Sequence, residues 1–395
     1  MPDIAGLRVG GMAVGLKESG RHDLFMAELA KGSTVAGVFT KSACASAPVD
    51  WCRKILPAGK IRGIVVNSGN ANAFTGKAGD RTVAHTVRAA GRLVGCPQKE
   101  VFVASTGVIG VPVEQDYIGA QIPKVHRVLA PDAWIDASQA ILTTDTFPKL
   151  AHRQAKIGDT TVEIAGIAKG SGMIAPDMAT MLSFVFTDAR IPADVLQKLL
   201  KRGADRSFNC ITVDSDTSTS DTLLLAATGQ AAHPPVTTSN GKLLADFREA
   251  LEAVLVDLAT QVVRDGEGAQ KLITIDIAGA ASDAAARRIG LAIGNSPLVK
   301  TAIAGSDANW GRVVMAVGKA GEKADRDKMS ISFGGIPITL KGKPVPGYDE
   351  SKVEEHLKGR AVHLAVDVGV GKGQARVWTC DLTHGYIEIN ADYRT

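Results

Sequence analysis

Thr180 carries a hydroxyl group at the junction between two contrasting segments of the sequence. The segment before it, AKGSGMIAPDMA at 168–179, contains glycine, serine and proline, whereas TMLSFVF at 180–186 is mostly apolar and predicts a buried strand. A threonine hydroxyl is a poor nucleophile unless a base lies beside it, and its own α-amino group becomes such a base once the chain is cut there. The pKa of this amine, about 7.7 to 8.0, suits proton exchange near neutral pH.

The same hydroxyl can make the cut between Ala179 and Thr180. Attack of its oxygen on the Ala179 carbonyl carbon moves the acyl group from nitrogen to oxygen, and water then hydrolyses the ester. Gly170 and Gly172 leave room for the strained turn that this attack needs. Threonine also opens many ordinary strands because of its β-propensity. The spacing by itself therefore leaves two interpretations open, a self-cleaving nucleophile and an ordinary strand residue.

Thr106 and Gly107 are candidates for stabilising the oxyanion that such an attack produces. They follow the strand-like run VFVAS at 101–105 directly. A threonine hydroxyl and a glycine N–H can point at one oxygen there, and losing one such donor typically costs about a hundred- to a thousand-fold in rate. The alternative interpretation is an ordinary turn after a strand.

Apolar runs that alternate with helical patterns predict an α/β fold of layered sheets, an α-β-β-α sandwich. The clearest helix is predicted over Lys242 to Val263, where apolar residues recur at spacings of three and four. We expect a main domain over 1–285 and a smaller C-terminal α/β domain over 286–395, whose tail returns to the active site. A strand is predicted over Tyr386 to Ile389. Other strands are expected at Val35 to Thr40, Ile64 to Val66, Val101 to Ala104, Thr161 to Ile167, Met181 to Thr187, Leu272 to Ala278, Met329 to Phe333 and Val362 to Val368.

Composition excludes several classes of function. The 45 basic and 41 acidic residues are scattered, which argues against a nucleic-acid or membrane-binding surface. Five cysteines without a Cys-x-x-Cys pair, and eight histidines without metal-ligand spacing, predict neither a disulfide framework nor a metal site. No cofactor is predicted. The absence of a signal-peptide pattern and of a long apolar stretch predicts a cytoplasmic protein.

Eight motifs in order carry a resemblance to a known family. The sequence resembles the ornithine acetyltransferase (glutamate N-acetyltransferase) family of arginine biosynthesis. The matching stretches are VAGVFT at 35–40, VNSGNANAFTG at 66–76, STGVIG at 105–110, TTDTFPK at 143–149, AKGSGMIAPDMATML at 168–182, DGEGAQK at 265–271, GSDANWGR at 305–312 and CDLTHGYIEINADYRT at 380–395. Two residues depart from the family's pattern, Phe74 in place of Cys and Asp177 in place of Asn.

The resemblance implies self-cleavage between Ala179 and Thr180, which gives chains 1–179 and 180–395, and an acetyl group carried on Thr180. It also implies that Thr106 and Gly107 form the oxyanion hole. The residues that it places at the substrate are Thr146, Lys169, Thr180, Glu267, Asn390 and Thr395. A heterotetramer of two cleaved pairs and small-molecule substrates, N-acetylornithine and glutamate, are further implications.

The charged residues of this set suit the chemistry that the resemblance implies. Lys169 can pair with a substrate α-carboxylate, and Glu267 can face an amino group of ornithine. Without the resemblance, a solvated loop lysine and a helix-ending turn are the stronger interpretations. Thr146 lies in a run that often satisfies turns. Asn390 and Thr395 are unexpected as ligands because chain ends are usually frayed.

The reaction expected from these features is a ping-pong transfer. N-acetylornithine gives its acetyl group to Thr180, ornithine leaves, and glutamate takes the acetyl group. One alternative is an amidase or aminopeptidase that hands the acyl group to water. Another is a ligand-binding protein without catalysis, in which Thr180 is only a strand residue. Whether acetyl-CoA also serves as a donor stays open, since the sequence has no diagnostic CoA motif.

Overall fold

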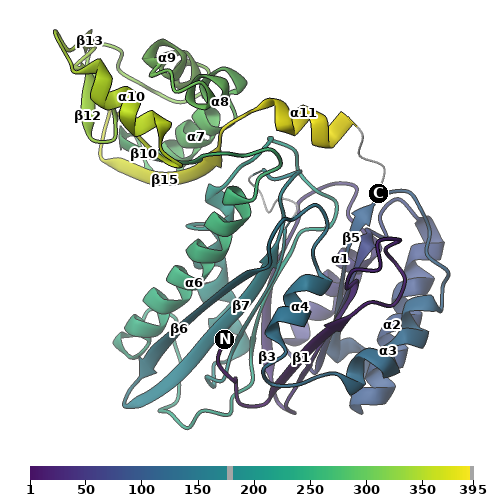
Figure 1. Ribbon diagram of the computed structural model, residues 1–395. Helices are drawn as coiled ribbons and strands as arrows, with labels where there is room; N and C mark the ends of the chain where they lie inside the picture. Colours follow the sequence, from purple (N-terminus) through teal and green to yellow (C-terminus); the bar gives the residue numbers. More distant parts are fainter. Residues whose placement is uncertain (176–180, 392–395) are drawn as a thin grey trace.

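The computed structural model describes residues 1–175 and 181–391 (Figure 1). The predicted cleavage site, Ala179 and Thr180, lies outside the described residues, as do Asp177 and Thr395. Within the described part, no helix is both long and apolar enough to cross a membrane.

The strands form three sheets. The first has the order β1-β2-β4-β5 and the second the order β3-β9-β8-β7-β6. The strands of the first sheet are β1 (Leu7–Met12), β2 (Leu24–Leu29), β4 (Gly63–Asn70) and β5 (Val101–Val108). Those of the second are β3 (Thr34–Phe39), β6 (Lys149–Ile157), β7 (Thr160–Lys169), β8 (Leu182–Thr187) and β9 (Thr222–Ala227).

The first two sheets pack face to face and bury the aromatic side chains between them. Phe25 of β2 lies 5.5 Å from Phe184 of β8, measured between ring centroids. Alternate residues of β8 point to opposite faces, so that Phe184 belongs to the core between the sheets and Val185 to the core under the helices. This arrangement of the two sheets positions everything described below.

Helices cover the outer faces of both sheets, which confirms the predicted α-β-β-α layering (Figure 1). Helix α6 (Ala245–Arg264) lies against β6 and β7 because Phe247, Leu251, Val254 and Leu258 form one buried stripe along it. The predicted helix over Lys242 to Val263 is therefore confirmed. Other helices around the two sheets are α1 (Ala47–Ile55), α2 (Gly76–Val94), α3 (Tyr117–Arg127), α4 (Trp134–Ala140) and α5 (Ala193–Ala204).

The third sheet and its helices form the smaller C-terminal part. Its strand order is β13-β12-β11-β14-β10-β15. Its strands are β10 (Leu272–Ala280), β11 (Ser330–Phe333), β12 (Ile336–Leu340), β13 (Lys343–Pro344), β14 (Ala361–Asp367) and β15 (Gly373–Cys380). Its helices are α7 (Asp283–Gly294), α8 (Pro297–Ala304), α9 (Trp310–Gly318) and α10 (Glu350–Lys358). Because β10 pairs with β14 and β15, the third sheet begins before the boundary expected after residue 285.

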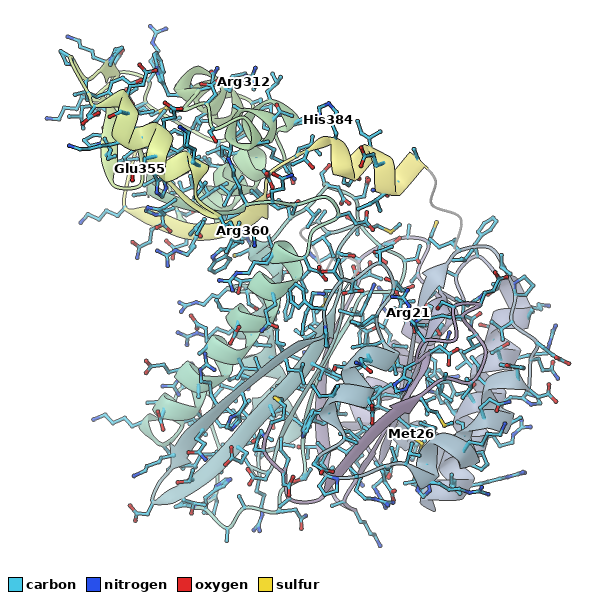
Figure 2. The ribbon with its side chains drawn as sticks, viewed as in Figure 1. Arg21, Met26, Arg312, Glu355, Arg360 and His384 are labelled. Carbon is cyan, nitrogen blue, oxygen red and sulfur yellow. The ribbon has the colours of Figure 1, made fainter. Side chains whose placement is uncertain are left out.

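The segment after β15 is helical, so the strand predicted over Tyr386 to Ile389 is wrong. Helix α11 (His384–Ala391) extends from the third sheet toward the two-sheet sandwich (Figure 1). Figure 2 labels His384 at its start, with Arg312 and Glu355 on the C-terminal side and Arg21 and Met26 in the sandwich. No neighbouring strand pairs with this segment in the described sheets, and an apolar run without a strand partner gains nothing from an extended conformation.

Candidate active site

Several strand ends meet at one end of the second sheet. Lys169, the last residue of β7, pairs with Leu182 at the start of β8, and Leu182 pairs with Thr222 at the start of β9. Thr106, near the end of β5 in the first sheet, lies within hydrogen-bond reach of Lys169, with the hydroxyl 3.4 Å from Nζ. The structure thus brings two predicted site residues together from different sheets.

Lys169 is held by a buried polar cluster. Its Nζ donates to the hydroxyl of Thr143 at 2.8 Å and lies 4.0 Å from a carboxylate oxygen of Asp145. Asp145 in turn accepts from the backbone N–H of Gly170 at 2.7 Å, the residue next to Lys169. Burial lowers the pKa of Lys169 below its usual value. The negative charges of Asp145 and Glu267 offset part of this effect. Only 2% of Lys169 is exposed, so the lysine is a buried cation rather than a solvated loop residue.

Lys149 joins this cluster to the end of helix α6. Its Nζ lies 2.6 Å from Asp145 and 2.6 Å from Asp265, and all three side chains are almost fully buried. Burial alone would raise the pKa of Asp145, but the positive charges of Lys169 and Lys149 lower it by a larger amount. The pKa of Asp145 therefore lies well below the usual range for aspartate. This ion network fixes the segment 143–149 against the loop that follows α6.

Thr146 faces this network. Its backbone N–H donates to Asp265 at 2.9 Å, and its hydroxyl donates to the other oxygen of the same carboxylate. Thr146 itself is exposed although Asp265 is buried. Its predicted contact with substrate stays a prediction, and in the structure its hydroxyl serves the buried network.

Glu267 lies on the turn between α6 and β10, where hydroxyl and amide donors surround its carboxylate. One oxygen accepts from Thr144 at 2.8 Å, and the other accepts from the Asn390 amide of α11 at 2.8 Å. The backbone N–H of Glu267 donates to the carbonyl of Ser171 at 2.9 Å. A β-carbon on Gly172 would overlap with this carboxylate, so any other residue there would displace the Glu267 side chain. Glu267 and Asn390, both predicted at the site, thus contact each other.

Gly107 adopts a backbone conformation that only glycine tolerates well. Its φ is +131°, and a β-carbon there would overlap with the backbone of Gly69 on the adjacent strand β4. The two glycines pair in the parallel register of β4 and β5. Glycine at 107 therefore follows from close strand packing, and this requirement is compatible with an N–H that is open to a substrate oxygen.

Two further cations lie close to the segment 143–149. Lys17 Nζ donates to the carbonyls of Leu142 at 2.7 Å and His22 at 2.8 Å. Burial and the nearby Arg21 lower the pKa of Lys17 to about 8. Arg21 itself is exposed and donates to the carbonyl of Thr143 at 3.2 Å. This edge of the site is therefore rich in positive charge.

Comparison with known proteins decides the family. A family model described as the ArgJ family matches residues 8–395. This chain belongs to the ArgJ family. It is 56% identical over 398 residues to the arginine biosynthesis bifunctional protein ArgJ of Gluconobacter oxydans, with all of this chain and 94% of that protein covered.

Solved ArgJ-family structures also resemble this chain. The crystal structure of ArgJ from Bacillus halodurans is 42% identical, with 54% of this chain and all of that chain covered and a TM-score of 0.52. An ornithine acetyltransferase from Mycobacterium tuberculosis, solved in complex with ornithine, is 34% identical, with 44% of this chain and 92% of that chain covered and a TM-score of 0.39. The family resemblance inferred from the eight motifs is thus confirmed, and with it the predictions of an acyltransferase and of a place in arginine biosynthesis.

The sequence motifs of this ArgJ-family chain contain several site residues that sequence reasoning did not single out. Thr144, Asp145 and Lys149 all lie in the TTDTFPK motif, of which only Thr146 was chosen. Asp265 lies two residues before Glu267 in the DGEGAQK motif. Charged residues inside these turn-like motifs were the signal that could have pointed to the site. The sequence alone does not show that they are buried, because their burial depends on contacts between segments more than a hundred residues apart.

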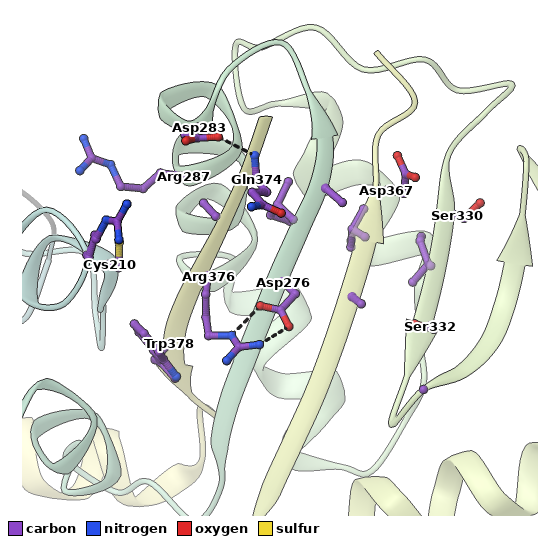
Figure 3. Close-up of a pocket in the computed structure, with 18 of the residues that line it drawn as sticks. Cys210, Asp276, Asp283, Arg287, Ser330, Ser332, Asp367, Gln374, Arg376 and Trp378 are labelled. Carbon is purple, nitrogen blue, oxygen red and sulfur yellow. Dashed lines mark hydrogen bonds and ion pairs between the residues drawn. The ribbon is translucent and has the colours of Figure 1, made fainter. Parts of the chain in front are cut away.

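A large pocket of the ArgJ-family chain lies elsewhere, on one face of the third sheet (Figure 3). Asp276 there forms a two-pronged ion pair with Arg376, with distances of 2.7 and 2.8 Å, and accepts a further hydrogen bond from His363 at 2.8 Å. Of the predicted catalytic and substrate-binding residues that the structure describes, none lines this pocket. We place the active site at the strand ends because the reactive groups of the motifs converge there.

No set of three or more His, Cys, Asp or Glu side chains in the described ranges is arranged to hold a metal ion. The buried carboxylates of the site, Asp145 and Asp265, are both ion-paired with Lys149.

Proposed function

We propose that this protein transfers the acetyl group of N-acetylornithine to glutamate through an acetyl group on Thr180. The observation that carries the proposal is the separation of charge at the site, where a buried lysine, Lys169, is set near a carboxylate, Glu267. Such a site suits a substrate that bears a carboxylate at one position and an ammonium group at another. Ornithine is such a molecule.

The proposed reaction runs in two halves. The Thr180 amine takes the hydroxyl proton while the oxygen attacks the acetyl carbonyl carbon of N-acetylornithine, and a tetrahedral oxyanion forms. The C–N bond then breaks, the departing ornithine nitrogen receives the proton from the ammonium group, and acetyl-Thr180 remains. In the second half the glutamate amine attacks this ester and the ester C–O bond breaks. A proton from the glutamate amine passes through the Thr180 amine to the threonine oxygen, which leaves N-acetylglutamate and the free enzyme.

Two groups of the first sheet are assigned to the oxyanion. The Thr106 hydroxyl and the Gly107 N–H are proposed as donors, and preorganised donors of this kind are commonly the largest single contribution to catalysis. Lys169 lies 3.4 Å from the Thr106 hydroxyl, so its positive charge also favours negative charge at that point. Thr106 is only 3% exposed, which keeps competing water away.

The acceptor half needs positive charge for a second carboxylate, because glutamate ends in an anion where ornithine ends in a cation. Arg21 and Lys17 supply positive charge beside Thr143, whose hydroxyl accepts from Lys169. These contacts support glutamate as the acceptor over water. The contacts with Thr146, Asn390 and Thr395 proposed for the substrate rest on the family resemblance.

Self-cleavage before Thr180 is part of the same proposal. The complete solved chain from B. halodurans matches 54% of this chain, and residues 180–395 make up a similar share. Denaturing gels and intact mass should give pieces 1–179 and 180–395 for the wild type, whereas Thr180→Ala should stay whole and inactive. A wild type that remained one active polypeptide would overturn the mechanism.

A hydrolase that uses the same nucleophile is the second candidate. The enzyme is incubated with N-acetylornithine in the presence and absence of glutamate, and ornithine and N-acetylglutamate are measured. The transferase should release ornithine in catalytic amounts only with glutamate present, with an equal amount of N-acetylglutamate. Release that is independent of glutamate would support the hydrolase.

Four parts of the proposal rest on the resemblance or on composition alone. They are the heterotetramer of two cleaved pairs, the cytoplasmic location, the absence of a cofactor and the possible use of acetyl-CoA as a second donor. An assay with acetyl-CoA and glutamate, without N-acetylornithine, tests the last of these. A chain that binds ornithine uncut and without turnover would instead favour the non-catalytic alternative.

A further inference from the structure

Three cationic side chains meet at two consecutive residues, Leu142 and Thr143, in the segment that follows helix α4. Lys17 Nζ donates to the carbonyl of Leu142 at 2.7 Å, and one Nη of Arg21 donates to the carbonyl of Thr143 at 3.2 Å. Lys169 Nζ donates to the hydroxyl of the same threonine at 2.8 Å. These neutral oxygens orient the cations but do not balance their charge.

Lys17 and Arg21 form no ion pair with any carboxylate in the part of the chain that the structure describes. Asp23 is a buried carboxylate nearby, but it accepts from four backbone N–H groups, those of residues 14–17, at 2.6 to 3.1 Å. Burial and then the charge of Arg21 lower the pKa of Lys17 to about 8, and the opposing effect of Asp23 is smaller than that of Arg21. Two like charges held close together in this way attract an anion.

Both cations keep N–H donors for such an anion. An ammonium group has three donors, and Lys17 uses two of them on backbone carbonyls. A guanidinium group has five, and Arg21 uses one on the hydroxyl of Ser19 at 3.4 Å and one on Thr143. Arg21 is exposed, so an anion can reach it from solvent. Its planar group matches the geometry of a carboxylate, which it can bind through two parallel hydrogen bonds.

The next residue along the chain contacts the opposite charge. The Thr144 hydroxyl donates to Glu267 at 2.8 Å, whereas Thr143 accepts from Arg21 and Lys169. These adjacent threonines therefore divide the site into an anionic side and a cationic side. The two amino acids of the proposed reaction differ in the same way, because the ornithine side chain ends in an ammonium group and the glutamate side chain ends in a carboxylate.

We propose that Arg21 and Lys17 form a separate subsite, which binds the side-chain carboxylate of glutamate and selects glutamate as the acetyl acceptor. This inference rests on the proposed function and deepens it by giving the two substrate side chains different places. Lys169 holds the α-carboxylate that both substrates share. The ornithine side chain then extends toward Glu267, and the glutamate side chain extends toward Arg21.

The length of glutamate fits this arrangement. The hydroxyl and carbonyl oxygens of Thr143 belong to one residue, so the nitrogens of Lys169 and Arg21 that donate to them lie at most about 11 Å apart. The two carboxylate carbons of an extended glutamate are roughly 5 Å apart, and each can pair with a nitrogen up to about 4 Å away. One glutamate molecule can therefore contact both cations. Aspartate is shorter by one carbon–carbon bond and fits less well.

The test is Arg21→Gln, which removes the charge and keeps an N–H group that can donate to Thr143. Acetyl transfer from N-acetylornithine to glutamate is measured, and kcat/KM for each substrate reports its own half of the ping-pong reaction. We expect kcat/KM for glutamate to fall by about tenfold to a hundredfold, because hydrogen bonds to a charged group are lost. The value for N-acetylornithine should stay within about a factor of two of the wild type.

Glutamine as the acceptor supplies a measurement that a merely structural role of Arg21 would not change. Glutamine has the length of glutamate but no charge on its side chain. The wild type should prefer glutamate, and the ratio of the kcat/KM values for glutamate and glutamine should fall at least about tenfold in Arg21→Gln. Arg21→Lys keeps the positive charge and should recover most of this preference.

Arg190→Gln is the matched control. Arg190 is also exposed, its Nε donates to the backbone carbonyl of Gly229 at 3.3 Å, and it forms no ion pair with the described residues. It follows the end of β8 at Thr187, whereas the candidate site lies at the start of that strand, at Leu182. This variant should keep the wild-type kcat/KM for both substrates and the wild-type ratio of glutamate to glutamine.

Two results would overturn the inference. One is an unchanged ratio of glutamate to glutamine in Arg21→Gln. The other is an equal loss of kcat/KM for N-acetylornithine and for glutamate, which would assign Arg21 a purely structural role at Thr143. A wild type that transfers no acetyl group from N-acetylornithine to glutamate would refute the proposed function instead.

Discussion

Lys149 is the residue on which the order of the active-site segment most depends. It is a buried cation shared by two buried carboxylates, Asp145 and Asp265, at 2.6 Å each. Asp145 also accepts a hydrogen bond from the backbone N–H of Gly170, next to Lys169, and Asp265 accepts one from the backbone N–H of Thr146. Removal of the shared cation leaves two charges without their partner in a region that excludes water, which is more costly than loss of a surface pair.

We expect Lys149→Met to lower the free energy of unfolding by about 3 to 5 kcal/mol, measured with urea at pH 7. The control is Lys198→Met, which breaks another pair at the same i, i+4 spacing. Lys198 lies 3.8 Å from Asp194, and both side chains are mostly exposed, so we expect a change of at most about 1 kcal/mol. Equal effects of the two changes would contradict the assigned role of the buried network.

The difference in unfolding free energy between the wild type and Lys149→Met should decrease as the pH falls. The folded-state pKa of Asp145 lies below its unfolded value, so the stability that it contributes is present above the unfolded pKa of about 3.9 and is lost as pH falls below it. The gap between wild type and Lys149→Met should therefore narrow between about pH 5 and pH 3. A gap that widened on acidification would contradict the ionised state of Asp145 in the folded protein.

Helix α11 is the element that connects the C-terminal part to the active site. The Thr383 hydroxyl before it donates to the carbonyl of Gly268 at 2.6 Å, and Asn390 near its end reaches Glu267. Gly268 has a φ of +71°, and a β-carbon there would overlap with the backbone of Gly385 and Tyr386. The docking of α11 thus depends on a glycine next to Glu267.

We expect Gly268→Ala to displace α11 and to raise KM for N-acetylornithine about tenfold. The reason is the loss of a hydrogen bond to a charged group, which is worth about 1.5 to 3 kcal/mol. Cutting of the chain should proceed as in the wild type. The measurement is steady-state kinetics together with intact mass.

Gly321→Ala is the control for backbone strain. Gly321 has a similar φ of +72°, but no atom lies within 4 Å of an added β-carbon. Its KM should stay unchanged. The same rise in KM in both variants would show that strain, and not the position of α11, is responsible.

At the scale of the whole molecule, the proposed cut before Thr180 would divide one sheet between two chains without dividing the fold. Strands β3, β6 and β7 belong to residues 1–179, whereas β8 and β9 belong to residues 180–395. The strand order β3-β9-β8-β7-β6 interleaves the two pieces, so β9 pairs with β3 and β8 pairs with β7 across them. The third sheet follows in the second piece.

We expect the two pieces to remain associated after the cut, because separation would expose paired strand edges and the core between the sheets. The wild type should elute from a sizing column as one species that gives two bands on a denaturing gel. In high urea the pieces should separate. Two independent native species after cutting would contradict the interleaved sheet.

The sequence determined the elements whose pattern is local. Strands β5, β7 and β8 and the long helix α6 were predicted to within a few residues, because their apolar residues follow the period of a strand or a helix. Strand β6 was missed because it lies at the edge of its sheet, where Arg153 and Lys156 face solvent and weaken the apolar pattern. The ordered motifs also determined the family. They led to the hypothesis that Thr106, Lys169, Glu267 and Asn390 converge at one site.

Only the tertiary structure decided which of these groups are buried and with what partners. The pairing of Lys149 with Asp265 and the contact of Glu267 with Asn390 both depend on residues far apart in the chain. A local pattern records the preference of a segment for a strand or a helix. Whether a charged group is shielded from water, and whether a hydrogen-bond donor lies within reach of it, depends on the surfaces that the fold brings together.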